Sequence, residues 1–255
     1  MNNFFIIGAQ RSGSSLLAEI LDSSLNIEMA KPIRPEPKYF LDDLGNKKFS
    51  EIKIQYEQKF FKKLSKCVTH FGEKSTSYIE SHRAAKNIKT IYPEAKIVAI
   101  LRDPVTRAVS NYYFSMQNGL ENEQFEDALS LEKERIKLPN KQTSVSPFAY
   151  ITRGYYMNHI SAYERIFGHE NIKICIFEKL ISEEKYLNSL TSWLGVPDIP
   201  RYERILSRKI NRSLRTQQQN ISVLKEIGEK YKNSIKELEA FIKADLDIWT
   251  KNKWY

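Results

Sequence analysis

Cysteine and histidine are scarce in this chain of 255 residues, which has two of the first and four of the second. Cys67 and Cys175 belong to no C-x-x-C pair and lie in apolar or strand-like stretches, so we expect core residues, with neither a disulfide framework nor a zinc site. The histidines show no metal-ligand spacing, and we read His82 and His169 as surface residues. Nothing in these residue types indicates a resident metal.

Long hydrophobic runs are also missing, and no stretch is apolar enough over a sufficient length to cross a membrane. The first residues carry no basic region, apolar stretch or small-residue cleavage site typical of a secretory signal. From these two observations we expect a soluble protein located in the cytoplasm.

The charge is of mixed sign, with 40 basic and 31 acidic residues and a net charge of +9. This excess favours anionic ligands without naming one. Most basic residues alternate with acidic ones in helix-period segments, as on solvated helix faces. Because no RRM, zinc-finger or helix-turn-helix signature is found, nucleic acid is not an expected partner.

Apolar runs bounded by turn residues predict strands buried on both faces, at 4–7, 67–71, 96–101 and 172–177. Helix-period segments lie between and after them, at about 14–24, 81–91, 105–117, 155–167, 184–194 and 220–242. This alternation predicts an α/β fold of three layers, with a mostly parallel sheet and helices on both faces.

We expect one domain over residues 1–255, because the 41% hydrophobic composition can form one large core and no repeat or low-complexity linker divides it. Residues 118–147 are polar and charged and include Pro139 and Pro147, so they are expected to form a helix followed by a loop, or a lid. Residues 216–255 form a C-terminal helical segment in this prediction.

The run FFIIGAQRSGSSLL, residues 4–17, reads as a buried strand that turns through a loop into an amphipathic helix. Gly8 and Gly13 keep the glycine spacing of a P-loop, G-x-x-x-x-G-K-[ST], but Ser14 stands where the lysine belongs. The loop's cation is instead Arg11, so amides, hydroxyls and a positive charge still face an anion, which need not be a nucleoside triphosphate. The alternative is an ordinary turn in which one of the serines after Gly13 satisfies the first-turn amides.

A second motif, AILRDPVTRAVSNYY, places Arg102 directly after a predicted strand and Pro104 in the first turn of the next helix. In open α/β sheets ligands bind at the carboxyl ends of strands, so Arg102 is expected near the loop of residues 8–15, with Ser110 as a second candidate. A salt bridge to Asp103 or another carboxylate is the alternative for Arg102. Asp103 as a magnesium ligand is disfavoured, because such an acid normally ends the apolar strand directly.

Together these two motifs resemble the PAPS-dependent sulfotransferase family, in particular a bacterial-like form of its carbohydrate-modifying, heparan-sulfate-type branch. The similarity covers nearly the whole chain and implies a P-loop NTPase-like fold. Further segments are similar to that family in the same order: EPKYF (36–40), GEKSTSYI (72–79), RGYYMNHISAYERIFG (153–168), IKICIFEKL (172–180) and LEAFIKADLDIW (238–249).

The resemblance implies PAPS as the donor co-substrate, PAP as the product and no required metal. The 3′-phosphate would contact Arg102 and Ser110, where an arginine can bind a terminal phosphate with two hydrogen bonds. The 5′-phosphosulfate would lie on the loop formed by Gln10, Arg11, Ser12, Gly13, Ser14 and Ser15. The basic run 208–215 would add Asn211, Arg212, Ser213 and Arg215, although an exposed basic turn is the alternative there.

In-line sulfuryl transfer needs a base for the acceptor's proton, and the resemblance assigns that role to Glu36. Glu36 lies between two prolines in RPEPKYF, a stiff segment that can hold a carboxylate at a cleft. Without the resemblance, a surface pairing of Glu36 with Lys38 or Arg34 is favoured.

Arg11 departs from the lysine found in many relatives at this position. An arginine cannot readily give up a proton, so we expect Arg11 to stabilise leaving-group charge by hydrogen bonding and not to act as a general acid. Lys74, at the predicted end of the second strand, is the other cation expected to face the sulfuryl group or an acidic acceptor. Its alternative role is an ion pair with Glu73 or Glu36.

The resemblance implies an acceptor hydroxyl or amine on a carbohydrate or glycolipid. Four tyrosines offer faces for sugar stacking, although core or helix packing is favoured for each: Tyr39, Tyr78, Tyr112 and Tyr113. A weaker acceptor-site set consists of Arg153, Tyr155 and His159.

Two other functions are open from the residues alone. A P-loop kinase of a small molecule would explain the glycines, but it calls for a lysine at position 14 and a magnesium-binding acid after an apolar strand. A non-catalytic polyanion-binding protein would explain the charge of +9, but not the loop or the setting of Glu36.

Overall fold

The computed structural model describes residues 1–45, 47–62, 66–138, 143–183, 185–197, 199, 202–206 and 219–255. The chain forms two compact units, one of Met1–Leu101 with Ile160–Ile210 and one of Arg102–His159 with Asn211–Tyr255, and each is described by itself. The single domain expected over residues 1–255 stays a prediction. The expected nucleotide contacts Asn211, Arg212, Ser213 and Arg215 lie outside the described residues.

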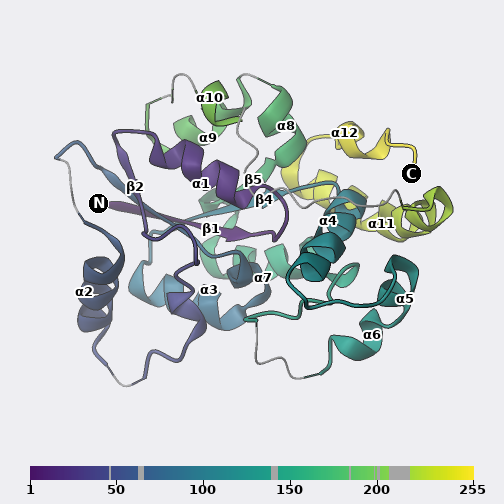
Figure 1. The fold of residues 1–255 in the computed structure, drawn as a ribbon. Coiled ribbons are helices and arrows are strands. Elements are labelled where there is room, and N and C mark those ends of the chain that lie inside the picture. Colours follow the sequence, from purple (N-terminus) through teal and green to yellow (C-terminus); the bar gives the residue numbers. More distant parts are fainter. Residues whose placement is uncertain are drawn as a thin grey trace. The chain divides into compact units, whose positions relative to one another are not determined.

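The first unit contains a five-stranded sheet in which every pairing is parallel, in the order β2-β3-β1-β4-β5 (Figure 1). The expected parallel sheet is therefore confirmed. Parallel strands end at the same edge of a sheet, so the carboxyl ends of β1, β3 and β4 lie next to one another. The strands are β1 (Asn2–Gly8), β2 (Ile27–Met29), β3 (His70–Lys74), β4 (Lys96–Leu101) and β5 (Ile172–Ile176).

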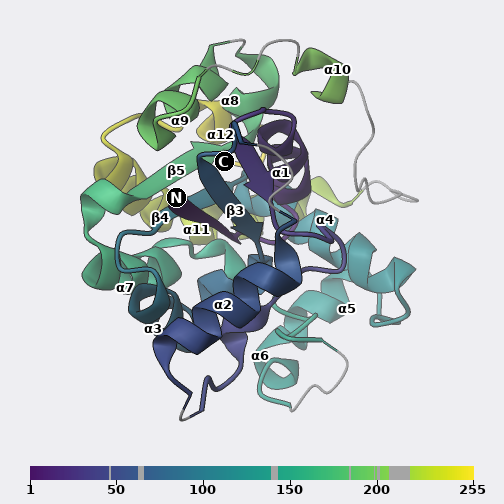
Figure 2. The ribbon, with the colours of Figure 1, turned by 90° about the vertical axis from the view of Figure 1, so that its left-hand side faces the viewer.

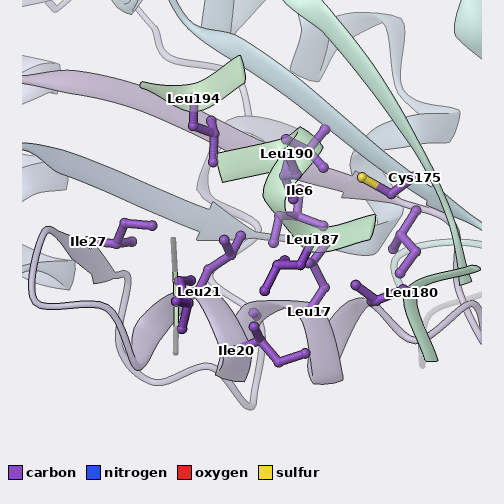
Figure 3. Packing of buried hydrophobic residues seen from close by; sticks show 14 of the residues in the cluster. Ile6, Leu17, Ile20, Leu21, Ile27, Cys175, Leu180, Leu187, Leu190 and Leu194 are labelled. Atoms are coloured by element: carbon purple, nitrogen blue, oxygen red, sulfur yellow. The ribbon is translucent and has the colours of Figure 1, made fainter. Parts of the chain in front are cut away.

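Helices cover both faces of this sheet, as the three-layer prediction requires (Figures 1 and 2). On one face, Phe4 and Ile6 of β1 pack with apolar residues of α1 and α9, and Figure 3 shows this cluster from close by. On the other face, the ring of Phe5 packs against Phe40 and Tyr92. The first face carries α1 (Ser14–Asp22), α8 (Phe177–Ser182), α9 (Tyr186–Leu194) and α10 (Glu203–Leu206), and the second α2 (Phe49–Phe60), α3 (His82–Ile91) and α7 (Met157–Phe167).

The second unit is helical, and α4 packs against α11. Its core contains the fully buried Trp249 and Tyr231, together with a buried arginine, Arg153, whose guanidinium donates to Asn111 Oδ1 at 3.1 Å and to the Ser146 carbonyl at 2.7 Å. Its helices are α4 (Pro104–Gln117), α5 (Phe125–Ser130), α6 (Glu132–Arg135), α11 (Ile221–Ile242) and α12 (Asp247–Thr250).

Two short helices, α5 and α6, occupy the segment 118–147, in which we expected a helix and a loop or a lid. Glu121 anchors this segment, because its buried carboxylate accepts hydrogen bonds from Arg135 at 2.9 Å and from the Tyr150 hydroxyl at 2.7 Å. Movement of the segment as a lid stays a prediction.

Two local predictions were wrong, and one strand was missed. The strand expected at 67–71 runs from His70 to Lys74, because its polar carboxyl-terminal residues are buried although they do not read as apolar. Cys67 is exposed and only Cys175 is buried. The short strand β2 was not expected, since three residues carry too little pattern to be recognised. No helix among the described residues has the length and apolar character needed to span a bilayer.

Candidate active site

The loop after β1 brings backbone amides to the carboxyl edge of the sheet. The Ala9 amide donates to the Ile100 carbonyl at 2.7 Å, which ties the start of the loop to β4. Arg11 and Gly13 both have left-handed backbones, with φ of 65° and 87°. Helix α1 then begins at Ser14, and no side chain within the described part of the chain caps it. The amides in the first turn of α1 therefore have no side-chain cap among the described residues, and such a helix N-terminus is suited to binding an anion. This differs from the alternative in which a serine side chain caps the helix.

Gly13 is required here for two reasons. A side chain on a left-handed backbone is strained, and a Cβ at this position would lie 2.3 Å from the ring of Phe177, the first residue of α8. The loop is therefore held against α8 by close packing.

Glu36 and Lys74 meet at the end of β3. Lys74 Nζ lies 2.9 Å from Glu36 Oε1, and the side chains are 3% and 15% exposed. Thr76 orients the carboxylate as well, because its amide donates to Glu36 Oε2 at 3.0 Å and its hydroxyl to Oε1 at 3.0 Å. Lys74 Nζ also lies 3.4 Å from Ser15 Oγ. The buried Lys74 ammonium thus contacts both the expected base, Glu36, and Ser15 at the end of the loop that follows β1.

These contacts decide between the pairings open at the sequence level. Glu36 pairs with Lys74, and not with Lys38 or Arg34, among the described ion pairs. The partner of Lys74 is accordingly Glu36 and not Glu73. The sequence did not single out Thr76, whose only signal is its place two residues after Lys74 in GEKSTSYI.

Behind this pair lies a second carboxyl, Glu73, whose side chain is buried. Tyr56 donates to Glu73 Oε2 at 2.5 Å and Ser75 donates to Oε1 at 2.6 Å. Burial raises the pKa of Glu73 to about 7, and the hydrogen bonds from Ser75 and Tyr56 oppose that rise. Sequence reasoning missed this cluster, since Tyr56 comes from α2 and only the fold brings it to β3.

Arg102 and Ser110 belong to the second unit. Arg102 comes directly before Asp103, the N-cap of α4, and the Arg102 carbonyl accepts a hydrogen bond from the Tyr156 hydroxyl at 2.6 Å. Ser110 lies two turns into α4 and is buried. Both residues are therefore held in the same unit by a capped helix.

Asp103 caps that helix. Its Oδ1 accepts the Thr106 amide at 2.6 Å, and its Oδ2 lies 3.3 Å from Trp254 Nε1. Burial raises the pKa of Asp103. In the part of the chain that the structure describes, no group of three or more His, Cys, Asp or Glu side chains could hold a metal ion.

Most of the suggested acceptor contacts are packing residues. Tyr78, Tyr112 and Tyr113 are at most 4% exposed, so they present no face for a sugar, whereas Tyr39 is half-buried. Arg153 is buried in the second unit with its guanidinium bonded to Asn111 and Ser146, which removes it from the acceptor set. Tyr155 and His159 are half-buried and stay candidates.

A parallel sheet with an amide-rich loop at the end of its central strand, and a carboxylate held by a lysine beside it, is typical of a P-loop-like α/β fold. The model of the sulfotransferase domain family matches residues 1–246, and the chain belongs to that family.

Curated relatives include bifunctional heparan sulfate N-deacetylase/N-sulfotransferase 1 of Caenorhabditis briggsae, 26% identical over 212 residues that cover 78% of this chain and 23% of the relative. Human heparan sulfate glucosamine 3-O-sulfotransferase 3B1 is 25% identical over 195 residues, which cover 76% of this chain and 46% of that protein. The chain thus spans less than half the length of these relatives.

Two solved structures share the fold. A sulfotransferase from Alicyclobacillus acidocaldarius aligns with a TM-score of 0.76 over 98% of this chain and 99% of its own, at 24% identity. Mouse sulfotransferase SULT7A1, solved as a complex with PAP, aligns with a TM-score of 0.53 over 88% of this chain and 66% of its own, at 17% identity.

Proposed function

We propose that this chain transfers a sulfuryl group from PAPS to a hydroxyl or amine of a carbohydrate or glycolipid. The observation that carries the proposal is Lys74, whose ammonium lies 2.9 Å from the Glu36 carboxylate and 3.4 Å from the Ser15 hydroxyl of the loop. This arrangement supports a base and an anion-binding loop that act on the same group. The names of the curated relatives, which include N- and 3-O-sulfotransferases of heparan sulfate, support a carbohydrate acceptor.

The residues present fit the donor. The uncapped start of α1 and the left-handed Arg11 offer amides and a cation to the 5′-phosphosulfate, for which Gln10, Arg11, Ser12, Gly13, Ser14 and Ser15 are the proposed contacts. Arg102 and Ser110 are proposed to bind the 3′-phosphate. The family resemblance alone supports four further candidate contacts to the nucleotide: Asn211, Arg212, Ser213 and Arg215.

In the proposed reaction Glu36 accepts the proton of the acceptor hydroxyl or amine as the acceptor atom forms its bond to sulfur. The bond between sulfur and the bridging phosphate oxygen breaks, and its electron pair leaves with PAP. Arg11 donates hydrogen bonds to the charge that develops there, without giving up a proton. Lys74 and Thr76 hold the Glu36 carboxylate in place for this step.

Thermal unfolding in the presence of candidate ligands tests the donor. A ligand that binds the folded state raises its apparent stability by mass action, so PAP without a metal is expected to raise the unfolding temperature more than magnesium ATP or heparin does. Stabilisation by magnesium ATP but not by PAP would overturn the proposal in favour of a kinase. Stabilisation by heparin alone, lost at high salt, would favour a polyanion-binding protein.

A mass-spectrometric screen tests the acceptor class. The protein is incubated with PAPS and a panel of desulfated glycans and glycolipids, and the products are searched for the mass of one added sulfuryl group. A second panel of hydroxyl and amine compounds without a sugar serves as the comparison. Sulfation of that panel alone would leave the donor assignment in place and remove the carbohydrate acceptor.

A further inference from the structure

The segment 36–40, which carries the proposed base, is tied to the segment after β3 by hydrogen bonds from alternate residues. Beyond the Thr76 contacts described above, the Lys38 amide donates to Ser75 Oγ at 2.9 Å and the Phe40 amide donates to the Tyr78 hydroxyl at 3.0 Å. The backbone on which Glu36 lies is therefore held by side chains and not by a strand pairing.

Ser75, like the anchor Tyr78, contacts the buried carboxyl of Glu73, and this carboxyl sets the direction of the Ser75 hydroxyl. Ser75 Oγ donates to Glu73 Oε1 at 2.6 Å, and Tyr56 donates to the other oxygen at 2.5 Å. Since the Ser75 hydrogen points to Glu73, the oxygen lone pairs are left to accept the Lys38 amide. The Lys38 amide thus donates to Ser75, and Ser75 donates to Glu73, which gives one continuous chain of hydrogen bonds.

Lys38 needs such support. Its φ of 53° is left-handed, a conformation that residues with a Cβ adopt only when their surroundings hold them in it. Lys38 is the residue before the short 3-10 helix Tyr39–Leu41 and comes two residues after Glu36. Release of the Lys38 amide would let the backbone relax and displace the Glu36 carboxylate.

We propose that Ser75 is a positioning residue for the reaction: its hydroxyl, directed by Glu73, fixes the backbone that carries Glu36. The catalytic part of this inference rests on the proposed function, whereas the anchoring part does not.

Ser77 supplies a matched control. Ser75 and Ser77 are both fully buried and lie two residues apart, but Ser77 Oγ has no hydrogen-bond partner among the described residues. Ser75→Ala and Ser77→Ala therefore remove the same atom from similar surroundings, and only the first removes an anchor.

Residue-resolved amide hydrogen exchange tests the anchoring, well below the unfolding temperature of each variant. In Ser75→Ala we expect the Lys38 amide to exchange about tenfold faster while the Phe40 amide keeps its wild-type rate, because loss of one hydrogen bond opens one site. Ser77→Ala should change neither amide. Tyr78→Phe should accelerate the Phe40 amide more than the Lys38 amide, because the Tyr78 hydroxyl accepts from Phe40 directly and reaches Lys38 only through its contacts with Ser75 and Glu73.

Equal acceleration of the Lys38 and Phe40 amides in Ser75→Ala would indicate general loosening and overturn the inference, as would an unchanged Lys38 rate. In turnover of PAPS with chemically desulfated heparin, Ser75→Ala should lower kcat about tenfold and leave the KM for PAPS unchanged. A wild-type kcat beside an altered exchange rate would refute the catalytic link.

Failure of the proposed function has a different signature. Absence of turnover by the wild type, or no stabilisation by PAP, would count against the proposed donor and acceptor, while the exchange pattern would still decide whether Ser75 holds the segment.

Discussion

At the scale of single residues, Glu36 and Lys74 differ in how far their side chains are exposed to solvent. The Lys74 side chain is 3% exposed, whereas the Glu36 side chain is 15% exposed. A general base has to contact the substrate group whose proton it takes, whereas a residue that only orients the base does not. This difference assigns proton transfer to Glu36 and orientation to Lys74 within the proposed function.

Glu36→Gln is expected to lower turnover by a factor of about 100 to 10,000, the usual contribution of a general base. The glutamine oxygen still accepts from Thr76, so stabilisation by PAP should stay near its wild-type value. Turnover and PAP thermal shifts measure the two effects. Glu51→Gln, an exposed change on α2, serves as the control, and wild-type turnover in Glu36→Gln would remove the base assignment.

Arg11→Ala separates binding from charge stabilisation. If Arg11 acts on the leaving group, turnover should fall by a factor of about 100 to 1,000 while PAP affinity falls much less. Steady-state kinetics beside PAP titrations give both quantities, with the exposed Arg34→Ala as control. Equal losses in turnover and affinity would reduce Arg11 to a binding residue.

At the scale of elements, apolar runs located β1 and β4 because these strands are buried on both faces of the sheet, and β5 although two of its residues are half-buried. The carboxyl end of β3 escaped that criterion. Gly72, Glu73 and Lys74 are buried through hydrogen bonds and an ion pair, and such partners become known only when the chain is folded.

The candidate site divides in the same way. The glycine spacing located the loop, and the family resemblance singled out Glu36 and Lys74. The resemblance could not tell which acid pairs with Lys74, and neither pattern nor resemblance indicated Ser75 or Tyr56. Hydrogen-bond partners 17 and 37 residues apart along the chain leave no periodic trace in the sequence.

Gly13→Ala tests the packing of the loop against α8. Gly195 has nearly the same left-handed backbone, with φ of 84° against 87°, but a Cβ there would meet nothing within 4 Å. Gly195→Ala should therefore cost about 1 to 2 kcal/mol for backbone strain alone. Gly13→Ala should cost about 1 to 3 kcal/mol more, because its Cβ would lie 2.3 Å from the Phe177 ring. Urea unfolding measures both, and equal losses would contradict the packing argument.

At the scale of the whole molecule, a buried acid on the central part of the sheet couples stability to pH. Glu73 titrates at about 7 in the folded protein, against an ordinary value of 4.5, because burial disfavours its charged form. Between these two values the folded state binds more protons than the unfolded state. Stability contributed by this group is therefore complete below about pH 4.5, falls as the pH rises and levels off above about pH 7.

Comparison of the wild type with Glu73→Gln isolates this effect, since the glutamine stays neutral at every pH. The free energy of unfolding of the wild type, minus that of the variant, should fall by about 3 kcal/mol from pH 4.5 to pH 8, the size that such a pKa difference implies. Urea unfolding at intervals across that range measures it. The exposed Glu51→Gln should give a curve parallel to the wild type. Parallel curves for Glu73→Gln as well would mean that Glu73 is not held in its protonated form by burial, and that the chain from Tyr56 to Ser75 stabilises the carboxylate fully.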